Sequence, residues 1–509
     1  MSHPAHLINS NSGAIRLENI QGDVLFGFSK DHEIFTLFTI TNPDEFKKKL
    51  PSVKITTSQE VAALRKEIAR VKVESPGQRL QTRLLNIGFS QQGLEALGIE
   101  GNLNDDGFKT GQYHDAYDLG DRPKDPDGPY EPDWKDAYTK RIDGILLGAG
   151  NNKKNAEAVV NDALKELQDS VQEIYRLEGK ARLDNNRVSL CDALSSELQA
   201  QRELDNIPAF DIGLMEYPIL LLEESWIPYL DKAKLIRVSV ILVGLEGDYE
   251  PKTKNPKQRP IWAVEGSFMA FRELKQLVPE FNEFLRQNPY GGISIPRELG
   301  SKIQGARFFG RWKNGVPIEL SPTFPDPKLV GDKRNNNFNY SQETGDEGQA
   351  SCPYSAHIRK MRPRTDLPEN RREATRIMRK GIPYGDEVKP EEARDNKTYY
   401  ERGLAFVCYQ SNLSDNGFRH IQKAWANDPN FLHEQKKMEC GYDPIIGQTR
   451  GPDRRRTTMN EEDKSSISLL EDFVVAQGGE YFFTPSIRAL YSVFCGKPYP
   501  GEPKSSYVP

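Results

Sequence analysis

The order of strand-like and helical segments constrains the fold of this chain more than any other feature. Runs with the apolar alternation of half-buried strands are predicted at 20–25, 33–40, 83–89, 142–149, 238–244, 262–272, 403–409 and 479–483. Helical patterns are predicted at 43–50, 58–71, 90–98, 156–176 and 273–287. The two kinds of segment mix without the regular alternation that a parallel sheet requires. The sequence therefore predicts an α+β fold with antiparallel sheets.

Length and charge exclude several classes of protein. The chain has 509 residues and a formal net charge of −5, which argues against a basic nucleic-acid binder. No apolar run approaches the 18 or so residues needed to cross a bilayer, so no membrane partner is expected. The five cysteines are scattered without a CxxC pair, which argues against a disulfide framework and a structural zinc site.

The N-terminus lacks the apolar core of a secretory signal. This predicts a cytoplasmic or non-classically secreted protein, and an extracellular location stays open as the alternative.

The segment around His357 carries the first chemical signal. His357 lies in Cys-Pro-Tyr-Ser-Ala-His-Ile-Arg-Lys, and Arg379 follows 22 residues later in Arg-Lys-Gly-Ile-Pro-Tyr-Gly. An imidazole here is a candidate metal or haem ligand, with the arginine facing the same cavity. Taken alone, the two residues are better explained as a hydrogen-bonded structural histidine and a solvated arginine at a helix end.

These two segments resemble those of the fungal dye-decolorizing (DyP-type) haem peroxidases. Further similar blocks occur in the same order, at 19–25, 307–313, 440–448 and 478–489, so the resemblance runs from about residue 17 to residue 495. It implies two ferredoxin-like domains of the dimeric α+β barrel superfamily, an N-terminal one at 17–236 and a C-terminal, haem-binding one at 237–497.

The resemblance also implies an activity. The expected function is a peroxidase that carries one haem b per chain, reduces hydrogen peroxide and oxidises dyes, phenolics or similar donors. The expected protein is a monomer or a homodimer.

The family pattern assigns roles to individual residues. His357 is the expected axial ligand of the haem iron, and Arg379 is the expected catalytic cation that stabilises developing negative charge. Asp443 is the expected carboxylate partner of the imidazole, with Asp415 as the fallback. A turn residue before a proline is the alternative reading of Asp443.

Three further expectations concern the surroundings of the haem. Arg311 is expected to contact a haem propionate, with an ordinary surface arginine as an equally weighted alternative. Trp425 is the expected surface radical site for dyes too bulky for the cavity, and Tyr384, Tyr399 and Tyr400 are further candidates. Plain packing is the alternative for these aromatic residues.

One block of the family is missing. The proton-shuttling Asp of a Gly-x-x-Asp-Gly motif is expected between 179 and 240, but the sequence from 183 to about 238 does not resemble the family. Reading the third base of each codon with the first two of the next turns Met215–Glu216 into glycine, and allows Asp-Gly-Ile-Ser-Asn-Pro-Ala-Val around it. We interpret the segment as an out-of-frame translation, with chance codon degeneracy as the alternative.

The missing acid bears on the predicted activity. Asp211 or Glu216 could replace it, although no motif supports either, and Glu265 is interpreted as structural. The competing hypothesis is therefore a haem-binding pseudo-enzyme or haem carrier without efficient turnover.

Overall fold

The fold is that of a computed structural model. It describes residues 15–181, 238–245, 248–250, 255–291, 294–330, 332–345, 347–448, 456–459, 466–469 and 471–497. The anomalous segment, from 183 to about 238, lies outside the described residues except for Val238 at its end.

One sheet of antiparallel strands organises the molecule. Its strands are β1 (His32–Ile40), β2 (Arg83–Phe89), β3 (Gly144–Gly150), β4 (Val171–Lys180), β5 (Ser267–Gln276), β6 (Met378–Arg379), β7 (Ile382–Gly385), β8 (Arg402–Gln410) and β11 (Val474–Thr484). They follow the order β5-β11-β2-β3-β1-β4-β7-β8-β6, and a further pairing of β5 with β8 closes the sheet into a barrel. A separate pair, β9 (Arg456–Met459) and β10 (Ser466–Leu469), lies apart from it. The predicted α+β class with antiparallel sheets is confirmed.

Alternation along the strands gives the barrel two apolar faces. Phe35 and Leu147 are cross-strand partners on the inner face, where Phe35 meets Phe271 with ring centroids 5.2 Å apart. Leu146 and Phe268 belong to the second core cluster, on the opposite face. Because successive side chains of a strand point to opposite faces, β1, β2, β3, β5, β8 and β11 each contribute to both cores.

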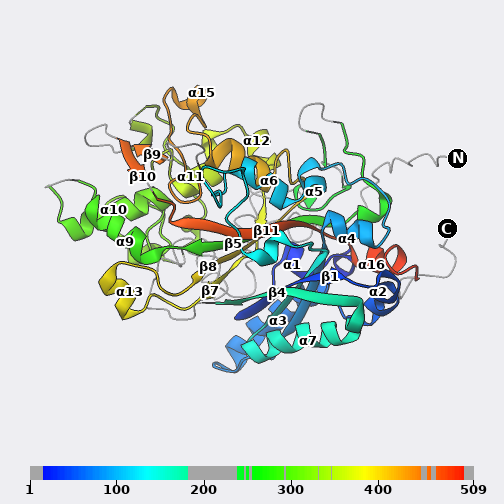
Figure 1. The fold of residues 1–509 in the computed structure, drawn as a ribbon. Helices are drawn as coiled ribbons and strands as arrows, with labels where there is room; N and C mark the ends of the chain where they lie inside the picture. The colour runs from blue at the N-terminus through cyan, green and yellow to red at the C-terminus, as the bar shows by residue number, and fades with distance from the viewer. Residues whose placement is uncertain are drawn as a thin grey trace.

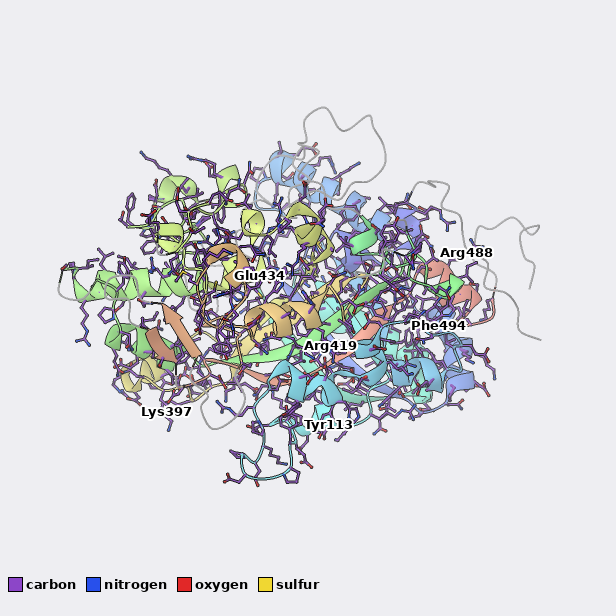
Figure 2. All side chains as sticks on the ribbon, turned by 90° about the horizontal axis from the view of Figure 1, so that it is seen from above. Tyr113, Lys397, Arg419, Glu434, Arg488 and Phe494 are labelled. Atoms are coloured by element: carbon purple, nitrogen blue, oxygen red, sulfur yellow. The ribbon has the colours of Figure 1, made fainter. Side chains whose placement is uncertain are left out.

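Helices cover the outside of the barrel. The longer ones are α3 (Ser58–Glu74), α7 (Lys153–Leu167), α9 (Val278–Gln287) and α10 (Arg297–Phe309). The shorter ones are α1 (Gly22–Leu25), α2 (Pro43–Lys49), α4 (Gln91–Ala96), α5 (Asp106–Thr110), α6 (Gln112–Leu119), α11 (His357–Met361), α12 (Glu369–Ala374), α13 (Pro390–Asp395), α14 (Phe418–His420), α15 (His433–Lys436) and α16 (Ile487–Ser492). In Figure 1, α3 and α7 lie below β1 and β4, whereas α9, α10 and α13 lie at the left end of the molecule. Figure 2 shows the same arrangement from above, with Lys397 near one end and Arg488 and Phe494 near the other.

Five predicted elements differ from the structure. The strand predicted at 262–272 begins instead with the 3-10 turn Ile261–Ala263, and β5 starts only at Ser267. The run 20–25 contains the helical turn α1, and 238–244 forms a 3-10 turn at Val238–Val240 followed by turns. The predicted helix 156–176 ends at Leu167, because Gln168 adopts a positive φ of 46° and the alternating residues after it form β4. The predicted helix 273–287 contains the end of β5 and begins as α9 at Val278, with Pro279 in its first turn.

The predicted domain boundary between 236 and 237 falls at the edge of the residues that the structure leaves undescribed, so this division stays a prediction.

Candidate active site

A large cavity lies on the outer face of the barrel, where β5, β8 and β11 meet the chain between 357 and 379. Its free space is about 1730 Å³, its open mouth included. Its lining includes Asp121, Arg272, Leu274, His357, Met361, Arg362, Pro363, Arg364, Arg372, Thr375, Arg376, Ile377, Met378, Arg379, Gly381, Leu404, Phe406, Phe418, Ile421, Gln422, Trp425, Ile446, Gln448, Val474 and Ala476. The cavity therefore combines apolar walls with one imidazole and a group of arginines.

His357 is fixed by a carboxylate behind it. It is the first residue of α11, and its Nδ1 lies 2.8 Å from Oδ2 of Asp443, whose side chain is fully buried. The other oxygen of Asp443 accepts hydrogen bonds from the backbone N–H groups of Ile445 and Ile446, at 2.8 and 3.0 Å. Because Nδ1 is taken, Nε2 is the ring nitrogen left to bind a ligand.

These contacts also determine the charge of Asp443. Burial by itself would raise the pKa of its carboxyl group, but the neighbouring His357 and the two backbone donors outweigh it, and the pKa lies below the ordinary value. The carboxylate is therefore ionised at neutral pH, and it polarises the imidazole.

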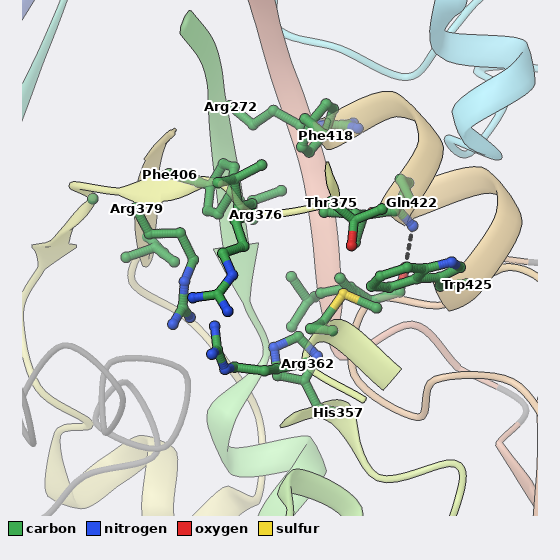
Figure 3. Close-up of a pocket in the computed structure, with 18 of the residues that line it drawn as sticks. Arg272, His357, Arg362, Thr375, Arg376, Arg379, Phe406, Phe418, Gln422 and Trp425 are labelled. Carbon is green, nitrogen blue, oxygen red and sulfur yellow. Dashed lines mark hydrogen bonds between the residues drawn. The ribbon is translucent and has the colours of Figure 1, made fainter. Parts of the chain in front are cut away.

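A group of guanidinium ions faces His357 across the cavity. Figure 3 shows the ends of Arg362, Arg376 and Arg379 pointing toward one another, with His357 close by and Trp425 on the other side. Burial lowers the pKa of Arg379 to about 10, which still leaves it protonated at neutral pH. The Nε of Arg372, another lining residue, is buried and has no acceptor among the described residues. The guanidinium groups of these arginines favour a ligand that carries carboxylate groups.

Carboxylates are scarce on this wall. Among the described residues that line the cavity, Asp121 is the one acid. It accepts hydrogen bonds from the guanidinium of Arg272 and from Nε1 of Trp134, so its charge is already neutralised.

The structure brings together three of the expected site residues, His357, Asp443 and Arg379, around one cavity. Asp415 lies elsewhere and pairs with Lys257 at 2.8 Å. Asp211 and Glu216 lie outside the described residues. Glu265 sits at the end of a turn with a φ of 64° and accepts a hydrogen bond from Asn19 at 2.5 Å, a structural arrangement.

Arg311 and Trp425 lie elsewhere than expected. Arg311 is absent from the cavity lining, and its guanidinium donates to the carbonyl oxygens of Gly315 and Asn335. Trp425 belongs to the π-helical turn Ile421–Ala426 and is not at the surface, since its exposed fraction is 2%. Its indole packs on Phe431 and lines the cavity.

The tyrosine candidates divide in the same way. Tyr399 and Tyr400 are exposed, whereas Tyr384 is buried, with 4% exposure.

Sequence reasoning missed the additional arginines of the cavity. Seven arginines occur between 359 and 379 in a chain whose net charge is negative. That local excess was the available signal, but it does not tell which of them face the cavity. Arg359, for example, is fully buried elsewhere and pairs with Asp366.

Among the described residues, no group of three or more His, Cys, Asp or Glu side chains is placed to hold a metal ion. None of the helices in the described ranges is long and apolar enough to cross a membrane.

Comparisons with known proteins place the chain among relatives. A family model described as "DyP dimeric alpha+beta barrel domain" matches residues 19–183, and one described as "Dyp-type peroxidase, C-terminal" matches residues 306–441. The dye-decolorizing peroxidase AauDyP1 of Auricularia auricula-judae is 37% identical over 491 residues, covering 94% of this chain and 86% of its own. A dye-decolorizing peroxidase of Mycena epipterygia is 34% identical over 504 residues, covering 94% and 87%.

Solved structures agree with these relatives. A structure of an ancestral D-type dye-decolorizing peroxidase superposes with a TM-score of 0.80 at 37% identity, covering 95% of this chain and all of its own. A dye-decolorizing peroxidase in complex with 2,6-dimethoxyphenol superposes with a TM-score of 0.76 at 33% identity, covering 94% of this chain and 100% of its own.

Proposed function

This chain belongs to the dye-decolorizing (DyP-type) peroxidase family, which makes it an oxidoreductase that acts on a peroxide, and we propose that it does so with one haem b held in the cavity described above. The proposed electron donors are dyes, phenolics or similar aromatic compounds. The phenol bound to one of the solved relatives supports this class of donor. The relatives do not favour the pseudo-enzyme hypothesis.

The donor set of the cavity fits a haem. A haem needs an axial nitrogen, an apolar slot for its ring and cations for its two propionates. His357 offers Nε2, and residues such as Leu404 and Phe406 supply apolar walls. The unsatisfied Nε of Arg372 would gain an acceptor from a propionate.

Asp443 sets the strength of the axial ligand. A carboxylate that accepts a hydrogen bond from Nδ1 holds the ring in one tautomer and increases electron density on Nε2. Its two backbone hydrogen bonds keep the carboxylate itself in place. The pair therefore orients the imidazole and makes it a stronger donor than a solvated histidine.

Arg379 supplies fixed positive charge to the reaction. When bound, haem supplies the two electrons that cleave the O–O bond of hydrogen peroxide. The protonated guanidinium of Arg379 stabilises the negative charge that develops on the peroxide oxygens, and its burial strengthens that interaction. The proton must move from one peroxide oxygen to the other, and Asp121, the one acid among the described lining residues, already accepts hydrogen bonds from Arg272 and Trp134.

The His357–Asp443 pair facing an arginine-lined cavity is the observation that carries this proposal. The test is an absorption spectrum of the full chain after haem is added, compared with His357→Ala. The chain should give a Soret band typical of an axial histidine, and His357→Ala should lose it or bind haem far more weakly. The matched control is His433→Ala, since His433 is a member of α15 and does not line the cavity. An identical Soret band in His357→Ala and the unmodified chain would refute the assignment.

A further inference from the structure

A second recess lies at one end of the barrel, behind the wall of the haem cavity. On β5, Arg272 and Leu274 line the cavity, whereas Lys275 and Leu277 line the recess. On β11, Val474 and Ala476 line the cavity, whereas Val475 and Gln477 line the recess. Because neighbouring side chains of a strand point to opposite faces, the two hollows are back to back, with one layer of backbone between them.

The recess lies at the mouth of the barrel, a position where barrels commonly bind ligands. This position follows because Lys275 and Val475, which both line the recess, are partners in the sheet near the end of β5 and the start of β11. The free space of the recess is about 590 Å³, its open mouth included, which leaves room for a ligand of one aromatic ring.

The walls of the recess offer both a ring contact and cations. Trp134, Leu277 and Val475 form its apolar part, and Arg122, Lys135 and Lys275 supply the positive charges. Trp134 has 8% exposure and donates from Nε1 to Asp121 at 3.1 Å, while Asp121 lines the haem cavity. One indole ring thus connects the two hollows.

The cations of the recess differ in availability. Lys135 is neutralised by Glu273 and Glu401, at 2.5 and 2.6 Å. Lys275 makes no ion pair or side-chain hydrogen bond with any described residue, and Arg122 reaches Asp472 only at 3.6 Å.

One anion opposes these cations at the rim. Asp133 also lines the recess, but it is exposed to solvent, which screens its charge. A bound carboxylate would therefore be placed between Lys275 and Arg122.

From this geometry we infer that the recess is a second donor site, which takes a phenol bearing a carboxylate on the ring. The inference rests on the proposed function, because the haem centre oxidised by hydrogen peroxide is the electron acceptor. The ring lies against Trp134 and the carboxylate against Lys275 and Arg122. The donor loses one electron across the β5–β11 layer and its phenolic proton to water, and it leaves as a phenoxyl radical.

Binding is tested first, with 4-hydroxybenzoate as the probe and isothermal titration of the haem-loaded full chain in the presence of cyanide. We expect saturable binding that Lys275→Glu weakens by at least about tenfold, that Arg122→Gln weakens less, and that 4-methylphenol does not reproduce. The control is Lys109→Glu, which makes the same charge change on an exposed lysine of α5 and should bind like the unmodified chain. Equal affinity of the unmodified chain and Lys275→Glu overturns the inference.

Turnover is tested second, after melting curves show that Lys275→Glu is folded. The KM for oxidation of 4-hydroxybenzoate should rise at least about fivefold in Lys275→Glu, while the KM for 4-methylphenol stays unchanged. A parallel change for both donors also overturns the inference, because the charge of the donor would then play no part. If the proposed function fails instead, the Soret band is absent but the binding of 4-hydroxybenzoate persists, so the two failures are distinguishable.

Discussion

The two sides of the haem cavity are built to different degrees of completeness. On the ligand side, His357 and Asp443 meet at 2.8 Å, and Asp443 is held by two further backbone donors. On the peroxide side, Arg379 is in place, but the one lining carboxylate among the described residues, Asp121, is committed to Arg272. If the proposed function holds, the comparison predicts that haem binding and peroxide turnover are separable, since the proposal assigns each to a different set of residues.

Restoring the missing acid should change the peroxide side most. Replacing residues 183–238 by the shifted reading, which encodes Asp-Gly-Ile-Ser, should raise the rate of reaction with hydrogen peroxide by about 10²–10⁴, the usual contribution of a positioned general acid–base group. Stopped-flow absorption at the Soret band measures it. A messenger RNA that encodes Leu214–Met215–Glu216 in the given frame, together with fast turnover by the protein as written, would contradict the frame-error interpretation.

Removing the cation should give the next largest effect. Arg379→Leu should slow the reaction with peroxide by about 10²–10³, because a preorganised donor to the developing charge is lost. Haem content should stay unchanged, as should the Soret position of the resting protein. Arg379→Lys keeps the charge and should recover part of the rate. Equal rates in Arg379→Leu and the unmodified chain would show that the arginine has no part in the reaction.

Weakening the His357–Asp443 pair should lower the affinity for haem more than it slows the reaction with peroxide. Asp443→Asn removes the negative charge behind the imidazole and should lower the affinity for haem by about 10–100-fold, as loss of a metal-ligand partner usually does. Competition with apomyoglobin measures that affinity. Asp415→Asn serves as the control, because Asp415 pairs with Lys257 and should leave the affinity unchanged.

The smallest expected effect is that of low pH on the stability of the folded chain, acting through Asp443. The pKa of Asp443 is lower in the folded chain than in the unfolded one, so its contribution to stability is present above the unfolded pKa of about 4 and is lost as the pH falls through the folded pKa. The free energy of unfolding in urea should therefore fall more steeply below pH 4 in the unmodified chain than in Asp443→Asn. Parallel pH profiles would show that the pair does not add to stability.

The sequence predicted the parts of the site that depend on short local segments. His357 and Arg379 lie in motifs of a few residues, and Asp443 precedes a proline in a turn, so a resemblance over those residues was enough to single out side chains that lie around one cavity. Arg362 and Arg376 were missed because only the tertiary path of the chain decides which of seven arginines face the cavity. The burial of Trp425 depends in the same way on Phe431, whose contact no local pattern reveals.

The fold, too, could be predicted from the sequence only where a local pattern determines it. Strands with clear alternation, such as β1 and β8, were predicted close to their observed bounds. The junction after Leu167 was misread because the helical and strand patterns run into each other, and a single residue with positive φ, Gln168, separates them. The closing of the sheet into a barrel depends on pairing between β5 and β8, more than a hundred residues apart, and no local pattern encodes it.

The place of β11 in the chain has a consequence for biosynthesis. This strand follows every other strand of the barrel in the sequence, yet it lies between β5 and β2 and contributes Val474 and Ala476 to the cavity. A nascent chain cannot complete the barrel until its last strand has left the ribosome. A chain that is cut short before residue 474 therefore lacks the strand that joins β5 to β2, and its barrel cannot close through that strand.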